Sequence, residues 1–200
     1  MFRDLGVISH GAAAICFLLL AIIVGTRYLR RNVDRALFLA AILSFLWAAT
    51  LVTQSLFGQP DFLIRYLLEL LRDASWLLLL FAILRDSFKS FGLSTRVRSM
   101  IAIGGGILII GLMSVSILEY FLELELMSGK AKVLGQIGLS LIGLSIIEQI
   151  WRNSTGLGRS SMKYLCIGVI TIFAFDFFMY TDALLFGQIS DSFWNARGFI

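Results

Sequence analysis

Six long apolar runs constrain this sequence more than any other feature. Each run holds about 20 residues, the length of α-helix that crosses a hydrocarbon core of about 30 Å. The sequence therefore predicts an all-α, polytopic membrane helix bundle that forms a single domain over residues 1–200. The expected helices cover residues 6–26, 36–57, 62–84, 100–119, 131–151 and 163–186, and a seventh is expected to start at about residue 198.

The composition agrees with a membrane protein. Hydrophobic residues make up 58% of the chain, and the mean hydropathy of +0.89 is too high for a water-soluble domain of this size. The first run is not expected to be a cleaved signal peptide, because it stays apolar through Val24 and then ends in the basic stretch "RYLRR".

Basic residues gather in alternate connections between the expected helices. They are Arg27, Arg30, Arg31 and Arg35, then Arg85, Lys89, Arg96 and Arg98, then Arg152, Arg159 and Lys163. The other connections carry the acidic residues Asp61, Glu119, Glu123, Glu125, Asp182 and Asp191. Basic connections face the cytoplasm, so the N-terminus is expected outside. The high pI is attributed to contact with anionic lipid headgroups, and no nucleic-acid partner is expected.

A stripe of polar residues marks the first half of the third expected helix. Arg65, Glu69, Arg72 and Trp76 are spaced by four, three and four residues, and Asp73 adjoins them. These side chains share one helical face. One interpretation is an interfacial helix start whose charges pair along the helix. Against it, Arg72 and Asp73 lie roughly 15 Å along the helix from its start, too deep for all the charges to reach water.

Polar residues on other helices lie at a similar depth. They are His10, Thr50, Thr53, Gln54, Gln136, Asp176, Tyr180 and Asp182. Their shared depth predicts a polar vestibule open to the outside. Two members have simpler interpretations: His10 as an interfacial hydrogen-bonding residue rather than a ligand or proton relay, and Asp182 as a carboxylate near enough to the helix end to reach the interface.

Asp176 is the costly residue of this group. It lies nearly 20 Å along the sixth helix from Lys163, where an unpaired carboxylate costs on the order of 3 kcal/mol. We expect Asp176 to contact Arg72, the deepest cation of the third helix, with Tyr180 completing the cluster. The alternative is that Asp176 is a packing residue hydrogen-bonded to Ser, Thr or backbone groups.

Catalytic and cofactor motifs are not found in the sequence. A single histidine excludes most metal sites and catalytic triads. The run "IGGGILIIG" follows no expected strand and lacks the lysine of a phosphate-binding loop. A retinal-type photoreceptor is disfavoured, since none of the four lysines lies in the middle of an expected helix. The sequence thus predicts no catalytic, cofactor-binding or metal-binding residue.

The stretches "IIEQIWRN", "MKYLCIGVITIFAFDFFMYTDALLF" and "FWNARG" resemble the N-terminal membrane region of the PrsK-type sensor histidine kinases of the PEP-CTERM/exosortase system. The resemblance implies a location in the bacterial inner membrane and a homodimeric parent protein. It also implies a cytoplasmic kinase core that uses ATP and Mg and phosphorylates a response regulator controlling exopolysaccharide and protein-sorting genes. None of the kinase-core motifs lies within these 200 residues.

The sequence therefore favours a membrane-embedded sensory domain of a two-component histidine kinase. The alternative is a small multi-span transporter or channel subunit, which intramembrane charges would also serve, although no inverted repeat or broken helix pair is found. The candidate site is the polar cluster of Arg65, Glu69, Arg72, Asp73, Asp176 and Tyr180, with His10, Gln136 and Asp182 as lesser candidates.

Overall fold

The computed structural model describes residues 2–26, 32–58, 62–87, 95–123, 127–153 and 156–200. Over these residues the chain is all-α, as predicted. Six long helices are followed by a short helix and a 3-10 turn: α1 (Phe2–Thr26), α2 (Asn32–Phe57), α3 (Phe62–Ser87), α4 (Thr95–Leu122), α5 (Gly129–Asn153), α6 (Gly156–Phe186), α7 (Asp191–Ala196) and η1 (Arg197–Phe199).

Several helices are longer than their apolar runs. The helix α6, for example, begins at Gly156, seven residues before the predicted start at residue 163. The extra turns contain polar residues. Backbone hydrogen bonds of a helix do not depend on apolar side chains, so the helix continues past the end of the apolar run. The prediction of a seventh helix from about residue 198 was wrong in its start, since helical structure resumes at Asp191.

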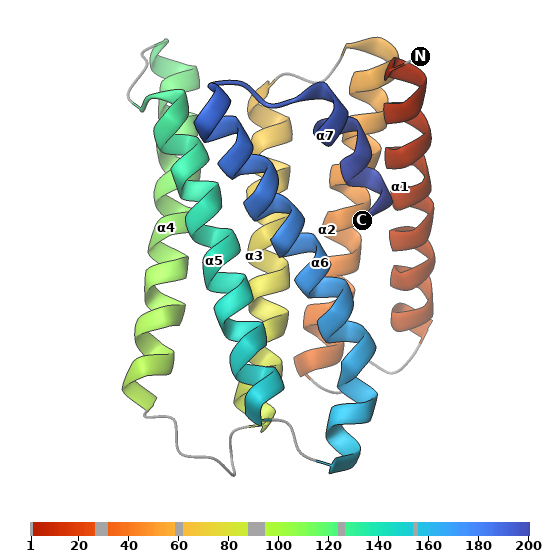
Figure 1. Ribbon diagram of the computed structural model, residues 1–200, viewed down its shortest axis with the longest axis vertical. Coiled ribbons are helices and arrows are strands. Elements are labelled where there is room, and N and C mark those ends of the chain that lie inside the picture. Colours follow the sequence, from red (N-terminus) through yellow and green to blue (C-terminus); the bar gives the residue numbers. More distant parts are fainter. Residues whose placement is uncertain (1, 27–31, 59–61, 88–94, 124–126, 154–155) are drawn as a thin grey trace.

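The six long helices run in alternating directions (Figure 1). Hence α1, α3 and α5 begin at the end of the bundle that carries the N-terminus, here called the N-terminal end, and finish at the opposite end. Neighbours in sequence pack together as α1 with α2, α2 with α3 and α5 with α6, while α3 also packs on α5. The helix α3 therefore lies between two pairs of helices.

Five of the described helices are long and apolar enough to cross a membrane, namely Leu5–Thr26, Asn32–Phe57, Ser99–Leu122, Gly129–Arg152 and Lys163–Phe186. The helix α3 is long enough but too polar for this group. Length and composition thus support five of the six predicted complete spans. The exception is the helix whose charged stripe is buried inside the bundle.

The core is apolar away from that stripe. Leu70, Leu77 and Leu80 of α3 are almost fully buried against Ile146 of α5 and Phe173 of α6. Leucines at these intervals place one face of α3 toward its neighbours along most of its length.

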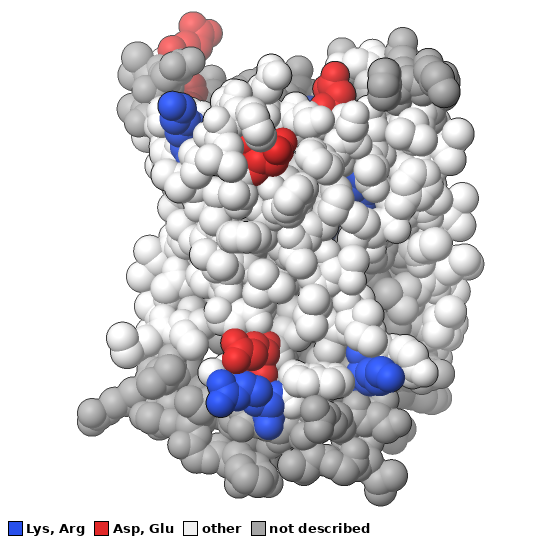
Figure 2. All heavy atoms as spheres, in the orientation of Figure 1, with Lys and Arg blue, Asp and Glu red and all other residues white. Residues whose placement is uncertain are grey.

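The outer surface is apolar too. Large hydrophobic side chains such as Ile15, Leu78, Ile107 and Phe178 are exposed on the helices. On the face shown in Figure 2, charged side chains lie toward the two ends, and the band between them carries none. An apolar band between charged ends is typical of membrane-spanning helix bundles.

The chain reverses direction after α6. Gly187 has φ +74°, a conformation that glycine adopts without strain. From there α7 and η1, together called the C-terminal segment (residues 191–199), turn back along the bundle and pack on α1 (Figure 1). Ser9 of α1 donates a hydrogen bond to the backbone carbonyl of Asn195. The segment therefore enters the bundle instead of leaving it.

The helix ends next to the basic connections lie at the end of the bundle opposite the N-terminus (Figure 1). Several residues on which the predicted orientation rests lie outside the described residues: Arg27, Arg30, Arg31, Asp61, Lys89 and Glu125.

Candidate functional site

A cluster of charged side chains is buried inside the N-terminal half of the bundle. Its members come from three elements: Glu69, Arg72 and Asp73 from α3, Asp176 from α6 and Arg197 from η1. Each of them is at most 4% exposed. Charged groups at such burial are retained only where they are paired, and the pairing here is extensive.

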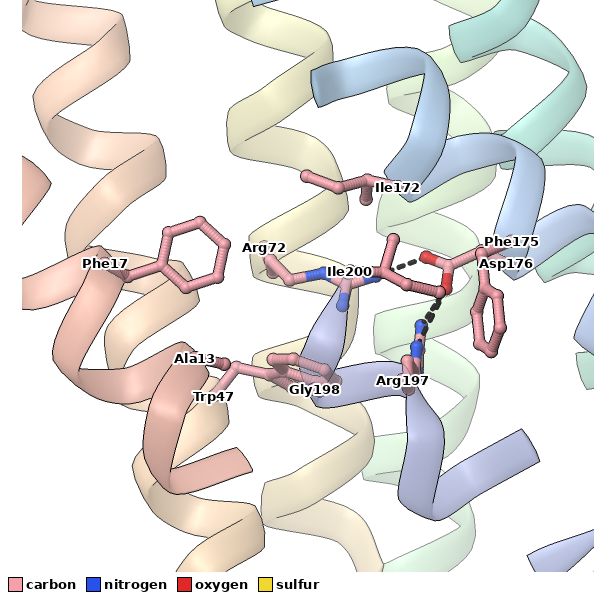
Figure 3. A pocket seen from close by; sticks show the side chains of 10 residues that line it. All are labelled: Ala13, Phe17, Trp47, Arg72, Ile172, Phe175, Asp176, Arg197, Gly198 and Ile200. Carbon is pink, nitrogen blue, oxygen red and sulfur yellow. Dashed lines mark hydrogen bonds and ion pairs between the residues drawn. The ribbon is translucent and has the colours of Figure 1, made fainter. Parts of the chain in front are cut away.

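Asp176 binds two arginines through its two carboxylate oxygens. Arg72 donates from Nη2 to Oδ2, and Arg197 donates from Nε to Oδ1 over 2.8 Å. Figure 3 shows the two guanidinium groups approaching the carboxylate from different sides. The predicted contact between Asp176 and Arg72 is thus confirmed, and the alternative of a merely packed carboxylate is wrong.

Glu69 is the second carboxylate that Arg197 reaches. Its Oε1 lies 2.5 Å from Arg197 Nη1 and accepts a hydrogen bond from the hydroxyl of Tyr180. The contact with Nη1 is an ion pair without hydrogen-bond geometry, as is the 2.7 Å approach of Nη2 to Asp176. One arginine of the C-terminal segment therefore joins α3 to α6.

Asp73 completes the set of carboxyl groups. It accepts from Nε and Nη2 of Arg72 at 3.1 and 2.9 Å, so Arg72 is shared between Asp73 on its own helix and Asp176 on α6. A guanidinium has five N–H donors in a planar fork and can hold two carboxylates in this way.

Aromatic rings enclose the arginines. The ring of Trp47 on α2 lies 4.2 Å from Cζ of Arg72 and 4.9 Å from Cζ of Arg197, measured to the ring centroid. Trp194 lies 5.5 Å from Cζ of Arg197. Cations over ring faces within about 6 Å are attracted by the ring quadrupole. The helix α2 therefore stabilises the cluster through the uncharged ring of Trp47.

Local sequence explains the arrangement. Glu69, Arg72 and Asp73 share a face of α3 because of their spacing, and Asp176 and Tyr180 lie one turn apart on α6. The close approach of η1 to α1 depends on Gly198, where a methyl group would lie 2.5 Å from the backbone nitrogen of His10. Glycine is the residue that fits there.

A small cavity adjoins the cluster on one side. It has a volume of about 20 Å³ and is lined by Trp47, Arg72, Asp176 and Arg197 together with apolar residues of α1, α6 and η1 (Figure 3). That volume is large enough for one water molecule.

A larger cavity of about 270 Å³ adjoins the cluster on the side of the N-terminal end. The lining residues come from α3, α5, α6 and the segment after α6: Phe62, Arg65, Tyr66, Glu69, Gly129, Lys132, Val133, Gln136, Tyr180, Ala183, Gly187, Gln188, Ile189 and Trp194. Glu69 belongs both to this cavity and to the charged cluster, and Tyr180, which also lines the cavity, donates a hydrogen bond to Glu69. We refer to it as the α3–α5–α6 cavity.

Of the six main sequence candidates, four are members of the cluster, Glu69, Arg72, Asp73 and Asp176, and a fifth, Tyr180, is hydrogen-bonded to it through Glu69. Arg65 lies apart, in the α3–α5–α6 cavity, with its guanidinium 5.1 Å from the Phe62 ring and 5.2 Å from the Trp194 ring.

The pairing along α3 that we considered is not observed for Glu69. Its ion pair is with Arg197, and no hydrogen bond or ion pair joins it to Arg65 or Arg72 among the described residues.

The three lesser candidates, Gln136, His10 and Asp182, lie in different places. Gln136 lines the cavity. His10 is 1% exposed and lies edge-on to Trp47, with 6.0 Å between ring centroids, and neither ring nitrogen has a hydrogen-bond partner in the described part of the chain. Asp182 is not part of the cluster and lines an open groove near Gln188 and Asp191.

Arg197 is the member that sequence reasoning missed. A charge count could have shown that a cation was missing, because the deep positions of α3 and α6 hold three carboxyl groups, Glu69, Asp73 and Asp176, against the single arginine Arg72. Such an excess of buried acid calls for another cation. The residues around it, "FWNARG", also carry the aromatic rings that enclose a guanidinium.

Within the described ranges, no group of His, Cys, Asp and Glu is arranged to hold a metal ion. Comparisons with protein-family models, curated proteins and solved structures find no match to this chain.

Proposed function

We propose that this chain is the membrane-embedded sensory domain of a signal-transduction histidine kinase of the PrsK type. In this proposal, occupancy of the α3–α5–α6 cavity controls how the C-terminal segment is held in the bundle. The observation that carries it is the position of Arg197, which ties that segment to Glu69 on α3 and Asp176 on α6. Glu69 also lines the cavity, so the tie and the cavity share a residue.

The proposal includes six membrane-spanning helices, with α3 as the sixth. Its charges are compatible with a bilayer because each charged member of the buried cluster has a partner inside the bundle. An unpaired charge at the bilayer centre would cost about 2.5–3.5 kcal/mol on insertion scales. The basic connections favour an N-terminus outside the bacterial cytoplasmic membrane.

The cavity and the C-terminal segment are linked by contact. Trp194 lines the cavity and packs beside Arg197, while Tyr180 lines it and donates to Glu69. A ligand shifts an equilibrium only when it binds the two states differently. A ligand that contacts both Trp194 and α3 would favour the arrangement in which the C-terminal segment is packed in the bundle, because Trp194 and α3 then face the same cavity.

Output would follow from displacement of the C-terminal segment, since helix shifts of this kind are a common signalling device. The proposal assigns phosphoryl transfer to a cytoplasmic kinase core outside these 200 residues. That core would use ATP and Mg, act in a homodimer and phosphorylate a response regulator.

A transporter or channel subunit is the second candidate. The buried charges favour it, because ionisable groups inside a bundle also mark ion and substrate pathways. The two candidates differ in what they require: a transporter moves a solute in proteoliposomes without any kinase, whereas the sensor does not.

The sensor proposal is tested first by the reading frame beyond the codon for Ile200, where a kinase core is expected. The second test is autophosphorylation of the full-length protein in membranes. Arg197→Gln should change its rate, because it releases the C-terminal segment from both carboxylates, whereas Arg152→Gln at an exposed pair should not. A stop codon shortly after Ile200, or equal rates for the two variants, would refute the proposal.

A further inference from the structure

Two buried polar side chains that line the α3–α5–α6 cavity have a donor without a hydrogen-bond partner among the described residues. Gln136 is 1% exposed, and its Nε2 has no hydrogen-bond partner among the described residues. The hydroxyl of Tyr66, 6% exposed, is likewise without a partner there. Buried donors of this kind are rare in folded proteins and call for an explanation. Both residues line the same cavity.

Arg65 adds an unpaired cation. Among the described residues its interactions are with the rings of Phe62 and Trp194, and it forms no ion pair or hydrogen bond. Stacking occupies the faces of a guanidinium and leaves its N–H edges free for a bidentate acceptor. Arg65, Tyr66 and Gln136 all line this cavity.

The other charged groups of the cavity are already engaged. Lys132 forms an ion pair with Glu119 of α4. Glu69 is held by Arg197 and Tyr180. Arg65, Lys132 and Glu69 are the charged residues that line the cavity, and they leave one formal positive charge. The charge balance fits a ligand with a single negative charge, and the nearby carboxylate of Glu69 disfavours a doubly charged one.

The rest of the lining is apolar or aromatic, with Phe62, Val133, Ile189 and Trp194 among it. The volume of about 270 Å³ lies just below the range of about 300–1,000 Å³ that is usual for ligand cavities, so the ligand must be small. We propose that the α3–α5–α6 cavity binds a small organic monocarboxylate with an apolar body. Its carboxylate is received by Arg65, Gln136 and Tyr66, and its apolar part packs on Trp194.

This inference rests on the proposed function, because it names the ligand class of the same cavity. The two are separable by experiment, since binding is measured on the purified chain without any kinase. Binding of a carboxylate without an effect on autophosphorylation would refute the sensor alone. An effect of cavity variants on autophosphorylation without carboxylate binding would refute the ligand class alone.

The test is equilibrium dialysis of the purified chain in lipid nanodiscs against phenylacetate, indole-3-acetate and 3-methylbutanoate. Phenylacetamide, which keeps the shape and removes the charge, is the matched control. At least one acid should bind saturably in the millimolar range or below, and the acid should bind about tenfold or more tightly than its amide. Absence of saturable binding for all three acids, or equal binding of acid and amide, would overturn the proposal.

Phenyl phosphate distinguishes the anion class. Tighter binding of phenyl phosphate than of phenylacetate would overturn the monocarboxylate and indicate a phosphate ligand. Weaker binding is expected, because the cavity offers one unpaired cation and lies beside Glu69.

Variants locate the site. Arg65→Gln should weaken binding of the acid by about tenfold to a hundredfold and leave binding of the amide unchanged. The affinity of Arg65→Lys for the acid should lie between that of Arg65→Gln and that of the parent protein. Arg152→Gln on the exposed end of α5 is the matched control and should bind as the parent does. Circular dichroism melts identify any variant that fails to fold, and for such a variant Gln136→Leu provides the same comparison. Unchanged acid binding in folded Arg65→Gln would overturn the assignment.

Discussion

Arg197 and Asp176 are bonded through the Nε and Oδ1 atoms at 2.8 Å, although 21 positions of sequence and a reversal of the chain separate them. The bond joins the C-terminal segment to a deep position of α6. The same guanidinium contacts Glu69 of α3. Arg197 is therefore the residue through which the C-terminal segment is attached to the charged cluster.

Replacing Arg197 by Gln should lower the free energy of unfolding by about 3–5 kcal/mol, because Glu69 and Asp176 lose a buried counter-ion. The measurement is denaturant-induced unfolding in mixed micelles, followed by circular dichroism. Arg152→Gln is the control: its partner Glu148 lies 3.3 Å away, and both side chains are more than 60% exposed. Its change should stay within about 0.5 kcal/mol, and an equal effect of the two variants would contradict the role of Arg197.

The pair of Arg72 and Asp176 is expected to be energetically coupled. Arg72→Gln and Asp176→Asn should each destabilise the bundle, and the double variant should lose less than the sum of the two. Coupling energies for residues in direct contact are about 0.5–3 kcal/mol. The double-mutant cycle is measured by the same unfolding experiment. Strictly additive effects would show that Asp73 and Arg197 alone satisfy the two side chains.

Gly198→Ala should displace the C-terminal segment from α1. The added methyl group meets the backbone of Ser9 and His10, which cannot rotate away as a side chain would. Overpacking of this kind costs about 1–3 kcal/mol. Gly111→Ala is the control, because no atom lies within 4 Å of the added group and alanine favours a helix. Equal stability of the two variants would be evidence against the close contact.

The proposed topology is tested by single cysteines in a chain whose Cys16 and Cys166 are replaced by serine. A cysteine in place of the exposed Gln188, next to the reversal after α6, should react in intact cells with a thiol reagent that does not cross membranes. A cysteine at position 96, in the first turn of α4, should resist it until the membrane is broken. The reverse pattern of labelling would invert the orientation.

The helices of this protein follow from the sequence alone, because long apolar runs and helical spacing act locally. The runs placed both ends of α1 to α6 to within seven residues, and the spacing from Glu69 to Trp76 put the polar residues of α3 on one face. Depth along the helix was enough to match Asp176 with Arg72, since both positions are counted from helix ends that the sequence marks.

Arg197 required the tertiary structure. Its depth in the bundle is not a count along a membrane-spanning helix, because the chain reverses at Gly187 and re-enters as α7 and η1. A short polar helix such as "DSFWNA" has no long apolar run from which its position inside the bundle could be predicted. Only the packing of Gly198 on α1, together with two carboxylates in need of a cation, brings Arg197 between Glu69 and Asp176.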